Sequence, residues 1–546
     1  MSDKLQKFRN VEHAIPEQYY AWQVFGSGLE NIGKNGKPVL LPLREPNDNE
    51  ILLRIDALGI CLSDIKIVNL GGNHPRLRGR NLAEEPIVLG HECAVTVVKA
   101  GSQWAKAFKK GDRFIVQADI YYKGVGYAFG YLIPGGMQQY TYLDEKALAG
   151  DDGCYLLPVK PTTGYSASAL AEPWACVEMS YRLEDRIYPD TDSPWYITAN
   201  PDPHILNIFP KSKIFAPNQF PAEGETSKDI IIQISDISAG KQMEAWLKYL
   251  APHGTMYVLG SADDVSNEYI SVDVGSVHYE YKRIIGGGRT LDEIKEKNMR
   301  SDLMPDGIAL FIGAGGPMGQ MHVQRALEKT DGPRKVVVTD LDAGRLEHLR
   351  VRSAELLKKR HVELITVCTK DFADTTSLNK HLESLAPKGY TDVVLLAPVP
   401  ALVTQAVDFS APCGFVNLFA GLGIGTIANV SLKKICEGVK IIGCSGSRIS
   451  DLSHVLQSVE EGSRDTNRSV AVIGGLFSAH EGLKAVKEAR FPGKVVIYPQ
   501  ILDLPLIPLE KIPEILPEVG QYLSKDGTWT QQAEEKLLER YLPWND

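Results

Sequence analysis

The fold is decided by the stretch Gly307-Ile308-Ala309-Leu310-Phe311-Ile312-Gly313-Ala314-Gly315-Gly316-Pro317-Met318-Gly319. Its first half is a short apolar run typical of a buried strand, and its second half is a glycine-rich turn. A helix is expected over 320–329, followed by a strand over 335–339 that ends in Asp340. Strand, glycine turn, helix, strand and acid in this order are typical of a dinucleotide-binding unit with a parallel sheet.

The glycines of this turn let the backbone approach a pyrophosphate, to which the start of the helix presents free N–H groups. Asp340 is expected to accept hydrogen bonds from the ribose hydroxyls, which favours NAD over NADP. The spacing G-x-G-G-x-x-G is one residue longer than the usual pattern, so either Gly313 and Gly315 form the tight turn with one extra residue, or Ala314, Gly316 and Gly319 carry the pattern. The candidate cofactor-binding residues are Gly313, Gly315, Gly316, Gly319, Asp340 and Arg345.

The first 180 or so residues have a different pattern, with short strand candidates separated by Gly, Pro and Asn turns. Strands are expected over 50–57, 94–98, 112–116 and 135–142, and a helix from about 163 to 182. Such a run of short strands favours a barrel-like or sandwich-like domain.

The segment 183–306 contains an internal repeat of a later part of the chain. A strand at 229–232 leads through a helix to 254–260 and then to 281–288, and the same order recurs at 392–395, 414–421 and 438–446. We infer that the insert is a second copy of the later half of the nucleotide-binding domain. Its glycine-turn half is expected to be missing, so no second cofactor site is expected.

After about Ser450 the chain is expected to return to the first domain. A helix over 484–490 and a strand over 493–497 are followed by a Pro-rich stretch and an amphipathic helix over 531–542. The tail from Ile501 onward carries no catalytic pattern.

Composition places the chain among ordinary globular proteins with two or three domains, because 546 residues exceed a single core. A net charge of −9 argues against nucleic acid as the main partner. No apolar run reaches the roughly 18 to 20 residues that cross a bilayer, and the first residues lack a signal-peptide pattern, so a cytoplasmic location is expected. The eight cysteines are dispersed without a CxxC pair, which predicts neither a disulfide framework nor a four-cysteine zinc site.

The chemistry-bearing stretch is Pro86-Ile87-Val88-Leu89-Gly90-His91-Glu92-Cys93, in which a histidine and a carboxylate follow a short apolar run. Cys61 lies thirty residues upstream, and Glu172 lies further downstream. Thiolate, imidazole and carboxylate are zinc ligands, and a catalytic zinc needs about three of them and an open position. From composition alone, the simpler interpretation is that these Cys, His and Glu residues are scattered and do not form one site.

Several motifs occur in a specific order: G-I-C-x-S-D at 59–64, L-G-H-E at 89–92, G-D-R at 111–113, A-E-P-x-A-C at 171–176, the glycine-turn region from 307, and G-K-V-V-I at 493–497. In this order they resemble the zinc-dependent medium-chain dehydrogenase/reductases of the alcohol dehydrogenase superfamily. The resemblance covers nearly the whole chain except the insert and the tail. Because Glu172 rather than a cysteine stands before Pro173, the chain resembles the sorbitol dehydrogenase and L-sorbose-1-phosphate reductase branch.

The resemblance implies an α/β fold, in which a β-rich GroES-like catalytic domain joins a Rossmann domain with a doubly wound parallel sheet and an inserted partial second Rossmann-like unit. The expected boundaries are 1–182 for the GroES-like catalytic domain, 183–306 for the insert, 307–455 for the NAD-binding Rossmann domain, and 456–546 for the return to the catalytic domain and a C-terminal helical tail. The implied activity is hydride transfer between a nicotinamide cofactor and a secondary alcohol or ketone of a polyol, sugar or sugar phosphate.

The resemblance also implies that Cys61, His91 and Glu172 bind a catalytic zinc ion, with Glu92 as a further ligand or exchange partner. Whether Glu92 or water completes the resting zinc stays open. The catalytic candidates are Ser63, Asp64 and Glu92: Ser63 passes the substrate proton outward, and Asp64 holds the ligand imidazole in the correct tautomer. Zinc lowers the pKa of a bound alcohol, which then releases a hydride to the nicotinamide.

The chain departs from the family in two ways. The four-cysteine lobe that many members carry after the G-D-R strand is absent, so one catalytic zinc and no structural zinc are expected. The insert is also unusual, and our hypothesis is that it packs on the nucleotide-binding sheet near the strand 414–421, where another subunit's sheet often pairs in this family. The expected assembly is a homodimer, or a monomer if the insert imitates the second subunit of the dimer.

The substrate is suggested by the loop Asn73-His74-Pro75-Arg76-Leu77-Arg78-Gly79-Arg80, which lies between two candidate ligands and offers three arginines. Arginine binds phosphate through two parallel hydrogen bonds, although a solvated basic loop is an equal alternative. Two other classes of function stay open. One is a lyase or epimerase that uses bound NAD without net redox, and the other is a non-catalytic binding protein, against which Ser63 argues.

Overall fold

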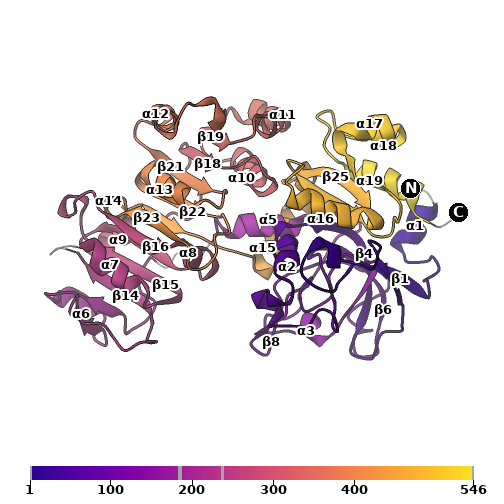
Figure 1. Cartoon of the computed structure of the whole chain (residues 1–546), viewed down its shortest axis with the longest axis horizontal. Coiled ribbons are helices and arrows are strands. Elements are labelled where there is room, and N and C mark those ends of the chain that lie inside the picture. The colour runs from indigo at the N-terminus through magenta and orange to yellow at the C-terminus, as the bar shows by residue number, and fades with distance from the viewer. Residues whose placement is uncertain (1–2, 183–186, 235–238, 544–546) are drawn as a thin grey trace. The chain divides into compact units, whose positions relative to one another are not determined.

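The computed structural model describes residues 3–182, 187–234 and 239–543, and the chain forms two compact units (Figure 1). Unit 1 combines Met1–Glu178 with Gly446–Asp546, and unit 2 is Met179–Ser445. The two ends of the chain therefore belong to one unit, and the insert and the glycine-turn region belong to the other. In the described residues, no helix is long and apolar enough to cross a membrane.

Unit 1 is built on an eight-stranded sheet with the order β11-β7-β6-β4-β26-β25-β27, in which β10 also pairs with β4. Its strands are β4 (Ile51–Ile60), β6 (Glu92–Ala100), β7 (Arg113–Val116), β10 (Tyr140–Leu143), β11 (Leu156–Pro158), β25 (Val470–Gly475), β26 (Lys494–Tyr498) and β27 (Ile507–Pro508). Every residue of β4 is buried, because this strand has neighbours on both sides and packing on both faces. The short strands expected at 50–57, 94–98 and 112–116 correspond to β4, β6 and β7.

The C-terminal segment completes this sheet, since β26 pairs antiparallel with β4 and places Val496 opposite Gly59. The helices around it include α2 (Leu62–Leu70), α4 (Tyr165–Ala169), α5 (Ala171–Met179), α16 (Ala479–Lys487) and α19 (Gln531–Tyr541). The single helix expected over 163–182 is therefore two helices. Pro173 has no backbone N–H to donate to Ala169, so the helix cannot continue without a break at this point.

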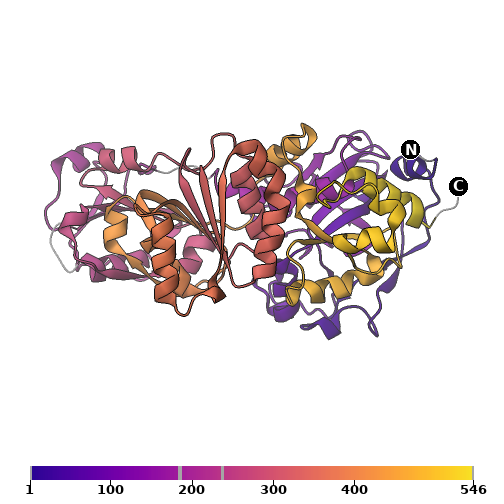
Figure 2. The same ribbon diagram turned by 90° about the horizontal axis from the view of Figure 1, so that it is seen from above.

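Unit 2 is built on an eleven-stranded sheet with the order β13-β12-β14-β15-β17-β24-β22-β21-β18-β19-β20. Its strands are β12 (Trp195–Ile197), β13 (Lys213–Phe215), β14 (Ser227–Gln233), β15 (Leu250–Leu259), β17 (Arg283–Gly288), β18 (Ile308–Ile312), β19 (Lys335–Asp340), β20 (Glu363–Cys368), β21 (Tyr390–Leu395), β22 (Ser410–Leu418) and β24 (Lys440–Ile442). Figures 1 and 2 show the magenta strands of the insert beside the orange strands of the later segment.

The glycine-turn region has the expected strand–helix–strand order within unit 2. Strand β18 is followed by α10 (Pro317–Glu328), and β18 pairs in parallel with both β19 and β21. The helix begins three residues earlier than expected, because proline is favourable at the first position of a helix. Helices α11 (Ala343–Arg360), α12 (Thr375–Leu385) and α13 (Pro400–Asp408) connect the following strands, so the α/β class with a parallel sheet is confirmed.

The order of the strands reveals a two-fold pseudosymmetry in unit 2. From the centre outward, β17, β15, β14, β12 and β13 of the insert mirror β24, β22, β21, β18 and β19 of the later segment. The two halves meet where β17 pairs antiparallel with β24, with Ile284 opposite Ile441. A second contact joins β16 (Tyr269–Asp273) to β23 (Ile427–Ser431), also antiparallel.

The two halves also share a local irregularity. The β14–β15 ladder shifts register between Ser227 and Asp229, and the β21–β22 ladder shifts between Tyr390 and Asp392. The shift coincides with the sequence Ala-Pro-His-Gly at 251–254 and Ala-Pro-Cys-Gly at 411–414, in which His253 and Cys413 both have a positive φ. The same strained turn in both halves supports an origin by duplication.

One expectation about the insert is wrong. The insert does not lack its first half, because β12, α6 (Pro203–Ile208) and β13 occupy the places that β18, α10 and β19 hold in the other half. These elements are only three to six residues long, and the connection Thr198-Ala199-Asn200-Pro201-Asp202 contains no glycine. The side chain of Asp202 accepts a hydrogen bond from His204 N at the start of α6, so a carboxylate stands where a phosphate-binding turn would have free N–H groups.

Candidate metal centre and cofactor site

Cys61 lies in unit 1 at the junction of β4 and α2, where it is the residue that caps the helix. The carboxylate of Asp64, in the first turn of α2, accepts a hydrogen bond from Cys61 N at 2.9 Å. The other oxygen of Asp64 accepts a hydrogen bond from Gly90 N at 3.2 Å. One buried carboxylate therefore connects the chain segment of Cys61 to the segment that ends in His91.

His91 lies between β5 (Ile87–Val88) and β6, and its side chain is buried. Its Nδ1 lies 3.6 Å from Asp64 Oδ1, and its Nε2 lies 3.3 Å from Ser63 Oγ. Burial opposes the charged form of His91, but the hydrogen bonds and negative charges of Asp64 and Cys61 outweigh it and raise the pKa well above its usual value. The surroundings of this imidazole are therefore arranged for a positive charge.

Glu92 is the first residue of β6 and is completely buried. Its Oε1 forms an ion pair with Lys494 Nζ at the start of β26. Register places Gly59 of β4 opposite Glu92, and a Cβ at Gly59 would lie 2.1 Å from Glu92 Oε2. Only glycine at position 59 leaves room for this carboxylate.

The ligand atoms of Cys61, His91 and Glu92 lie within 4.8 Å of one another. In residues 3–182, 187–234 and 239–543, this is the one group of three or more such side chains placed to hold a metal ion. Glu92 Oε2 is a buried atom without a hydrogen-bond partner, whereas His91 Nδ1 faces the carboxylate of Asp64. Since buried polar atoms are normally satisfied, the orphaned oxygen of Glu92 fits a bound cation, and the mixed S, N and O donor set suits zinc.

Glu172, the fourth expected ligand, lies in the first turn of α5 and is buried, but it is not part of this group of three. Its Oε1 lies 4.0 Å from Cys176 Sγ. Burial raises the pKa of Glu172 to about 7, with the charge of His91 opposing and the charge of Glu92 adding to the shift. The charges of His91 and Glu92 therefore act on Glu172. The carboxylate whose ligand atom lies with those of Cys61 and His91, however, is that of Glu92 and not that of Glu172.

Ser63 is half-buried and its hydroxyl lies beside the His91 ring, as the expected role in proton transfer requires. Sequence reasoning missed Lys494, although the motif at 493–497 contains it. The signal that could have identified it is a lysine inside an otherwise apolar strand, because a buried lysine needs an anionic partner.

The three arginines of the loop 73–80 point to different partners. Arg76 forms an ion pair with Asp119 at 2.5 Å, whereas Arg78 donates to Gly126 O and Arg80 to Glu85 O. The loop is therefore held by specific contacts, and its three guanidinium groups do not converge on one point.

The glycine turn of unit 2 shows which glycines are required. Gly313 has a φ of 75°, a Cβ at Gly315 would lie 2.7 Å from the Asp340 carboxylate, and a Cβ at Gly319 would lie 2.4 Å from Ala314 Cα. A Cβ at Gly316 would meet open space. Gly313 therefore forms the tight turn, Gly315 and Gly319 allow close packing, and Gly316 is the extra residue that caps α10.

Asp340 lies at the carboxyl end of β19 beside this turn. Its Oδ2 accepts a hydrogen bond from Gly315 N at 2.7 Å, and its Oδ1 accepts one from Asp342 N at 3.0 Å. Arg345 lies in the first turn of α11, where its Cβ is 3.0 Å from the place that a Cβ of Gly315 would take. The structure thus brings Gly315, Asp340 and Arg345 together at one edge of the sheet.

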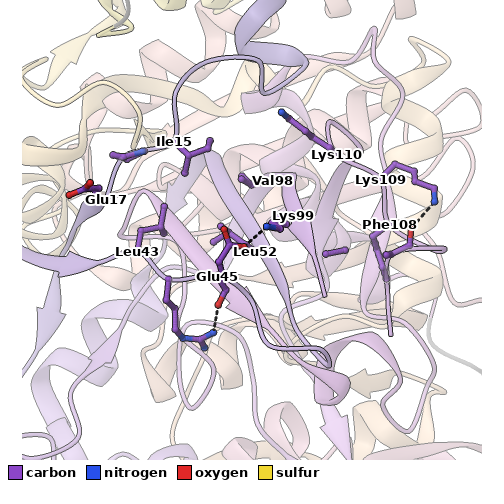
Figure 3. Close-up of a pocket in the computed structure, with 14 residues that line it drawn as sticks. Ile15, Glu17, Leu43, Glu45, Leu52, Val98, Lys99, Phe108, Lys109 and Lys110 are labelled. Carbon is purple, nitrogen blue, oxygen red and sulfur yellow. Dashed lines mark hydrogen bonds and ion pairs between the residues drawn. The ribbon is translucent and has the colours of Figure 1, made fainter. Parts of the chain in front are cut away.

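A pocket of about 660 Å³ in unit 1 lies away from the metal-ligand group (Figure 3). Leu52 and Val98, two of the residues that line it, lie at the ends of β4 and β6 opposite to Gly59 and Glu92. Lys99 at its wall pairs with Glu45. This pocket therefore contributes nothing to the candidate metal centre.

Comparison with known proteins agrees with this arrangement. The family model described as the alcohol dehydrogenase GroES-like domain matches residues 47–150, which contain Cys61, His91 and Glu92. A mannitol-1-phosphate 5-dehydrogenase of Aliivibrio fischeri is 25% identical over 512 residues, which cover 90% of this chain and 92% of that protein. An L-sorbose 1-phosphate reductase of Klebsiella pneumoniae is 23% identical over 508 residues, which cover 90% of this chain and 92% of that protein.

At least part of the insert is included in these similarities, since the tenth of the chain that they leave out is shorter than the insert. Among solved structures, the 2R,3R-butanediol dehydrogenase of Bacillus subtilis superimposes with a TM-score of 0.53 at 16% identity, covering 88% of this chain and 99% of that one. At this identity the likeness concerns the fold alone. It confirms a GroES-like domain joined to a Rossmann domain.

Proposed function

Because the chain belongs to the medium-chain dehydrogenase/reductase superfamily, in its polyol dehydrogenase branch, we propose that it is a zinc-dependent polyol or sugar-phosphate dehydrogenase. The observation that carries the proposal is the group of Cys61, His91 and Glu92, whose ligand atoms lie within 4.8 Å of one another. One buried atom of this group, Glu92 Oε2, lacks a hydrogen-bond partner.

The proposed reaction oxidises a secondary alcohol to a ketone, while a nicotinamide cofactor takes up a hydride and a proton is released. A zinc ion held by this group would polarise the substrate oxygen, and the cofactor would accept or return the hydride. Ser63 Oγ, 3.3 Å from His91 Nε2, is placed to relay the hydroxyl proton, accepting it while its own proton passes outward to solvent. Asp64 holds the segments of Cys61 and His91 together and fixes the orientation of the imidazole.

For the cofactor we propose NAD. Gly313 and Gly319 give the turn the tight backbone that a pyrophosphate needs, and α10 is a helix of 12 residues whose free N–H groups begin there. The carboxylate of Asp340 ends the neighbouring strand, where it would accept hydrogen bonds from both ribose hydroxyls and repel a 2′-phosphate.

The substrate class follows from the names of the relatives that match over nine tenths of the chain. One acts on mannitol 1-phosphate and the other on L-sorbose 1-phosphate, according to their names. We therefore propose a polyol phosphate or the corresponding ketose phosphate as the substrate of this chain.

The test is a panel of hexitols, ketohexoses and their phosphates, with zinc analysis of the same preparation and NADH absorbance as the readout. Replacing Cys61 by Ser is expected to lower both the zinc content and the rate by at least about 100-fold, because a weaker ligand replaces the thiolate. Cys154→Ser is the matched control, since Cys154 is an exposed cysteine outside the group.

A Cys61→Ser variant with unchanged zinc and unchanged rate would refute the zinc site. Turnover of a sugar without any net change in nicotinamide absorbance would instead identify a lyase or epimerase that uses the cofactor transiently.

A further inference from the structure

Arg76 differs from the other two arginines of its loop in what it packs against. Its guanidinium carbon lies 5.3 Å from the centre of the Tyr131 ring. The ring of the candidate zinc ligand His91 lies 6.2 Å from the same ring. The side chain of Tyr131 therefore lies between the guanidinium group of Arg76 and the ring of His91. A small sugar phosphate is long enough to span this separation.

The turn that carries Arg76 is fixed by His74. The His74 ring also packs on Tyr131, at 5.6 Å between ring centres, and its Nδ1 accepts a hydrogen bond from Arg76 N at 3.3 Å. Burial and the charge of Arg76 lower the pKa of His74, which favours the neutral imidazole beside the positive charge of Arg76. Tyr131 itself is buried, which makes it a rigid platform for both side chains.

Asp119 is the present partner of Arg76, at 2.5 Å. Gly446 leaves room for this carboxylate, since a Cβ at position 446 would lie 2.5 Å from Asp119 Oδ2. The side chain of Arg76 is 45% exposed and that of Asp119 only 18%. A guanidinium group has five donors, so Arg76 can hold Asp119 and still offer N–H groups on its open side to a second anion.

The other arginines do not share this arrangement. Arg78 donates to the backbone oxygen of Gly126, and Arg80 donates to the backbone oxygen of Glu85 and pairs with its carboxylate at 3.3 Å. Within the part of the chain that the structure describes, neither guanidinium group packs over the Tyr131 ring as that of Arg76 does. The loop therefore presents one cation, not three, beside the ring that contacts His91.

We propose that Arg76 is the specificity-determining residue that binds the phosphate of a phosphorylated polyol or ketose whose reacting carbon lies at the metal centre. This inference rests on the proposed function. The planar N–H groups of a guanidinium bind phosphate oxygens in pairs. The hydrogen bond from Arg76 Nη1 to Asp119 Oδ1 holds this guanidinium in place. An unphosphorylated sugar would gain nothing from this contact.

The experiment compares kcat/KM for a hexitol and for its 1-phosphate in the zinc-loaded protein. Arg76→Gln is expected to lower the ratio of the two values, phosphorylated over free, by about 10- to 100-fold, as the loss of charge-assisted hydrogen bonds predicts. Arg76→Lys should give a ratio between those of Arg76→Gln and the wild type, because lysine keeps the positive charge but lacks the planar pair of N–H donors. Asp119→Asn should change the ratio in the opposite direction, since the amide oxygen can still accept the hydrogen bond from Arg76 while the competing negative charge is removed.

Arg78→Gln is the matched control and should leave the ratio as in the wild type. If Arg76 only anchors its loop, Arg76→Gln will change the rates with both substrates by the same factor, and the inference fails while the proposed function stands.

A second readout does not depend on turnover: binding of inorganic phosphate to the zinc-loaded protein, measured by calorimetry. Loss of this binding in Arg76→Gln but not in Arg78→Gln, in a protein that oxidises neither substrate, would refute the proposed function and retain the anion site. Equal phosphate binding by both variants, together with an unchanged ratio, would overturn the inference.

Discussion

Lys494 is the residue on which the buried charge of Glu92 depends. Its own side chain is 4% exposed, and the two groups form an ion pair inside unit 1. Removing one partner of a buried pair leaves an uncompensated charge, which costs about 3 to 5 kcal/mol. The centre therefore relies on a contact between two strands that are far apart in the sequence.

We expect Lys494→Met to lower the free energy of unfolding by about 3 kcal/mol in protein freed of metal by a chelator. The loss should be smaller in zinc-loaded protein, because a cation beside Glu92 Oε2 compensates the same carboxylate. Denaturant titration with and without chelator measures both values. Lys99→Met is the control, since Lys99 and its partner Glu45 are exposed and such pairs contribute little. An equal loss in both metal states would show that Glu92 does not face a metal.

His348 on α11 gives unit 2 a defined dependence on pH. Burial and the charge of Arg352 lower its pKa from 6.5 to about 4. Between these two values His348 binds a proton in the unfolded chain but not in the folded chain, so its contribution to stability rises with pH from about 4 to 6.5 and is constant above. His348→Gln should reduce this rise by at most about 3 kcal/mol, as followed by unfolding at a series of pH values.

His361→Asn is the control for this prediction. His361 is exposed at the end of the same helix with a φ of 55°, a conformation that asparagine tolerates. The control should keep the slope of the wild type between pH 4 and 6.5. Identical slopes in all three proteins would show that His348 titrates normally in the folded state.

At the scale of residues, sequence reasoning reached the side chains that form recognisable local patterns. Cys61, Asp64 and His91 belong to short motifs, and the structure brings them together. Lys494 and Tyr131 were not predicted, because their roles depend on which strand or loop lies beside them. Lys494 is 402 positions away from Glu92, and no local period in the sequence encodes that contact.

At the scale of elements, strong periodicity predicted the long strands and helices, and weak periodicity hid the short ones. The repeat in the insert was visible because β14, β15 and β17 are apolar runs that reappear as β21, β22 and β24. Strands β12 and β13 have three residues each, too few to show a period. The β17–β24 pairing follows from topology, which an internal repeat suggests but does not determine.

The antiparallel contact between β16 and β23 can be tested with an engineered disulfide. Ser271 and Asn429 are exposed and directly opposite each other, where Cβ atoms of paired strands lie roughly 4.5–5.5 Å apart. The double variant Ser271→Cys/Asn429→Cys should form a disulfide within one chain under mild oxidation, because the Cα spacing of directly opposed antiparallel residues, roughly 4.5–5.5 Å, lies within the range of natural disulfides. Non-reducing electrophoresis and mass spectrometry detect the bond.

Each single cysteine variant is the control for this experiment, and neither should form the cross-link. Ser271→Cys/Ile427→Cys tests the register, since Ile427 is opposite Asp273 and not opposite Ser271. Cross-linking of the mismatched pair with the same yield, or a bond that joins two chains, would contradict the pairing.

At the scale of the whole molecule, the palindromic strand order suggests what the insert does. In the wider family, as the sequence resemblance implies, the sheet of one subunit often pairs with the sheet of another. Here the neighbour of β24 is β17 of the same chain, and the second contact, β16 with β23, is also internal. We propose that the insert takes the place of a partner subunit, so that the edge strand of the nucleotide-binding half is already paired.

The protein should therefore be a monomer in solution, with a mass of 60.1 kDa by light scattering that does not change with protein concentration. The oxidised Ser271→Cys/Asn429→Cys variant should have the same mass, because its bond joins two halves that never separate into different subunits. If the wild type instead has twice this mass, the chain dimerises through a surface other than the β17–β24 seam, and the insert must serve another purpose. If the mass doubles only in reduced protein and the oxidised variant stays a monomer, the two halves exchange between chains, which would place the pairing between subunits and contradict the proposal.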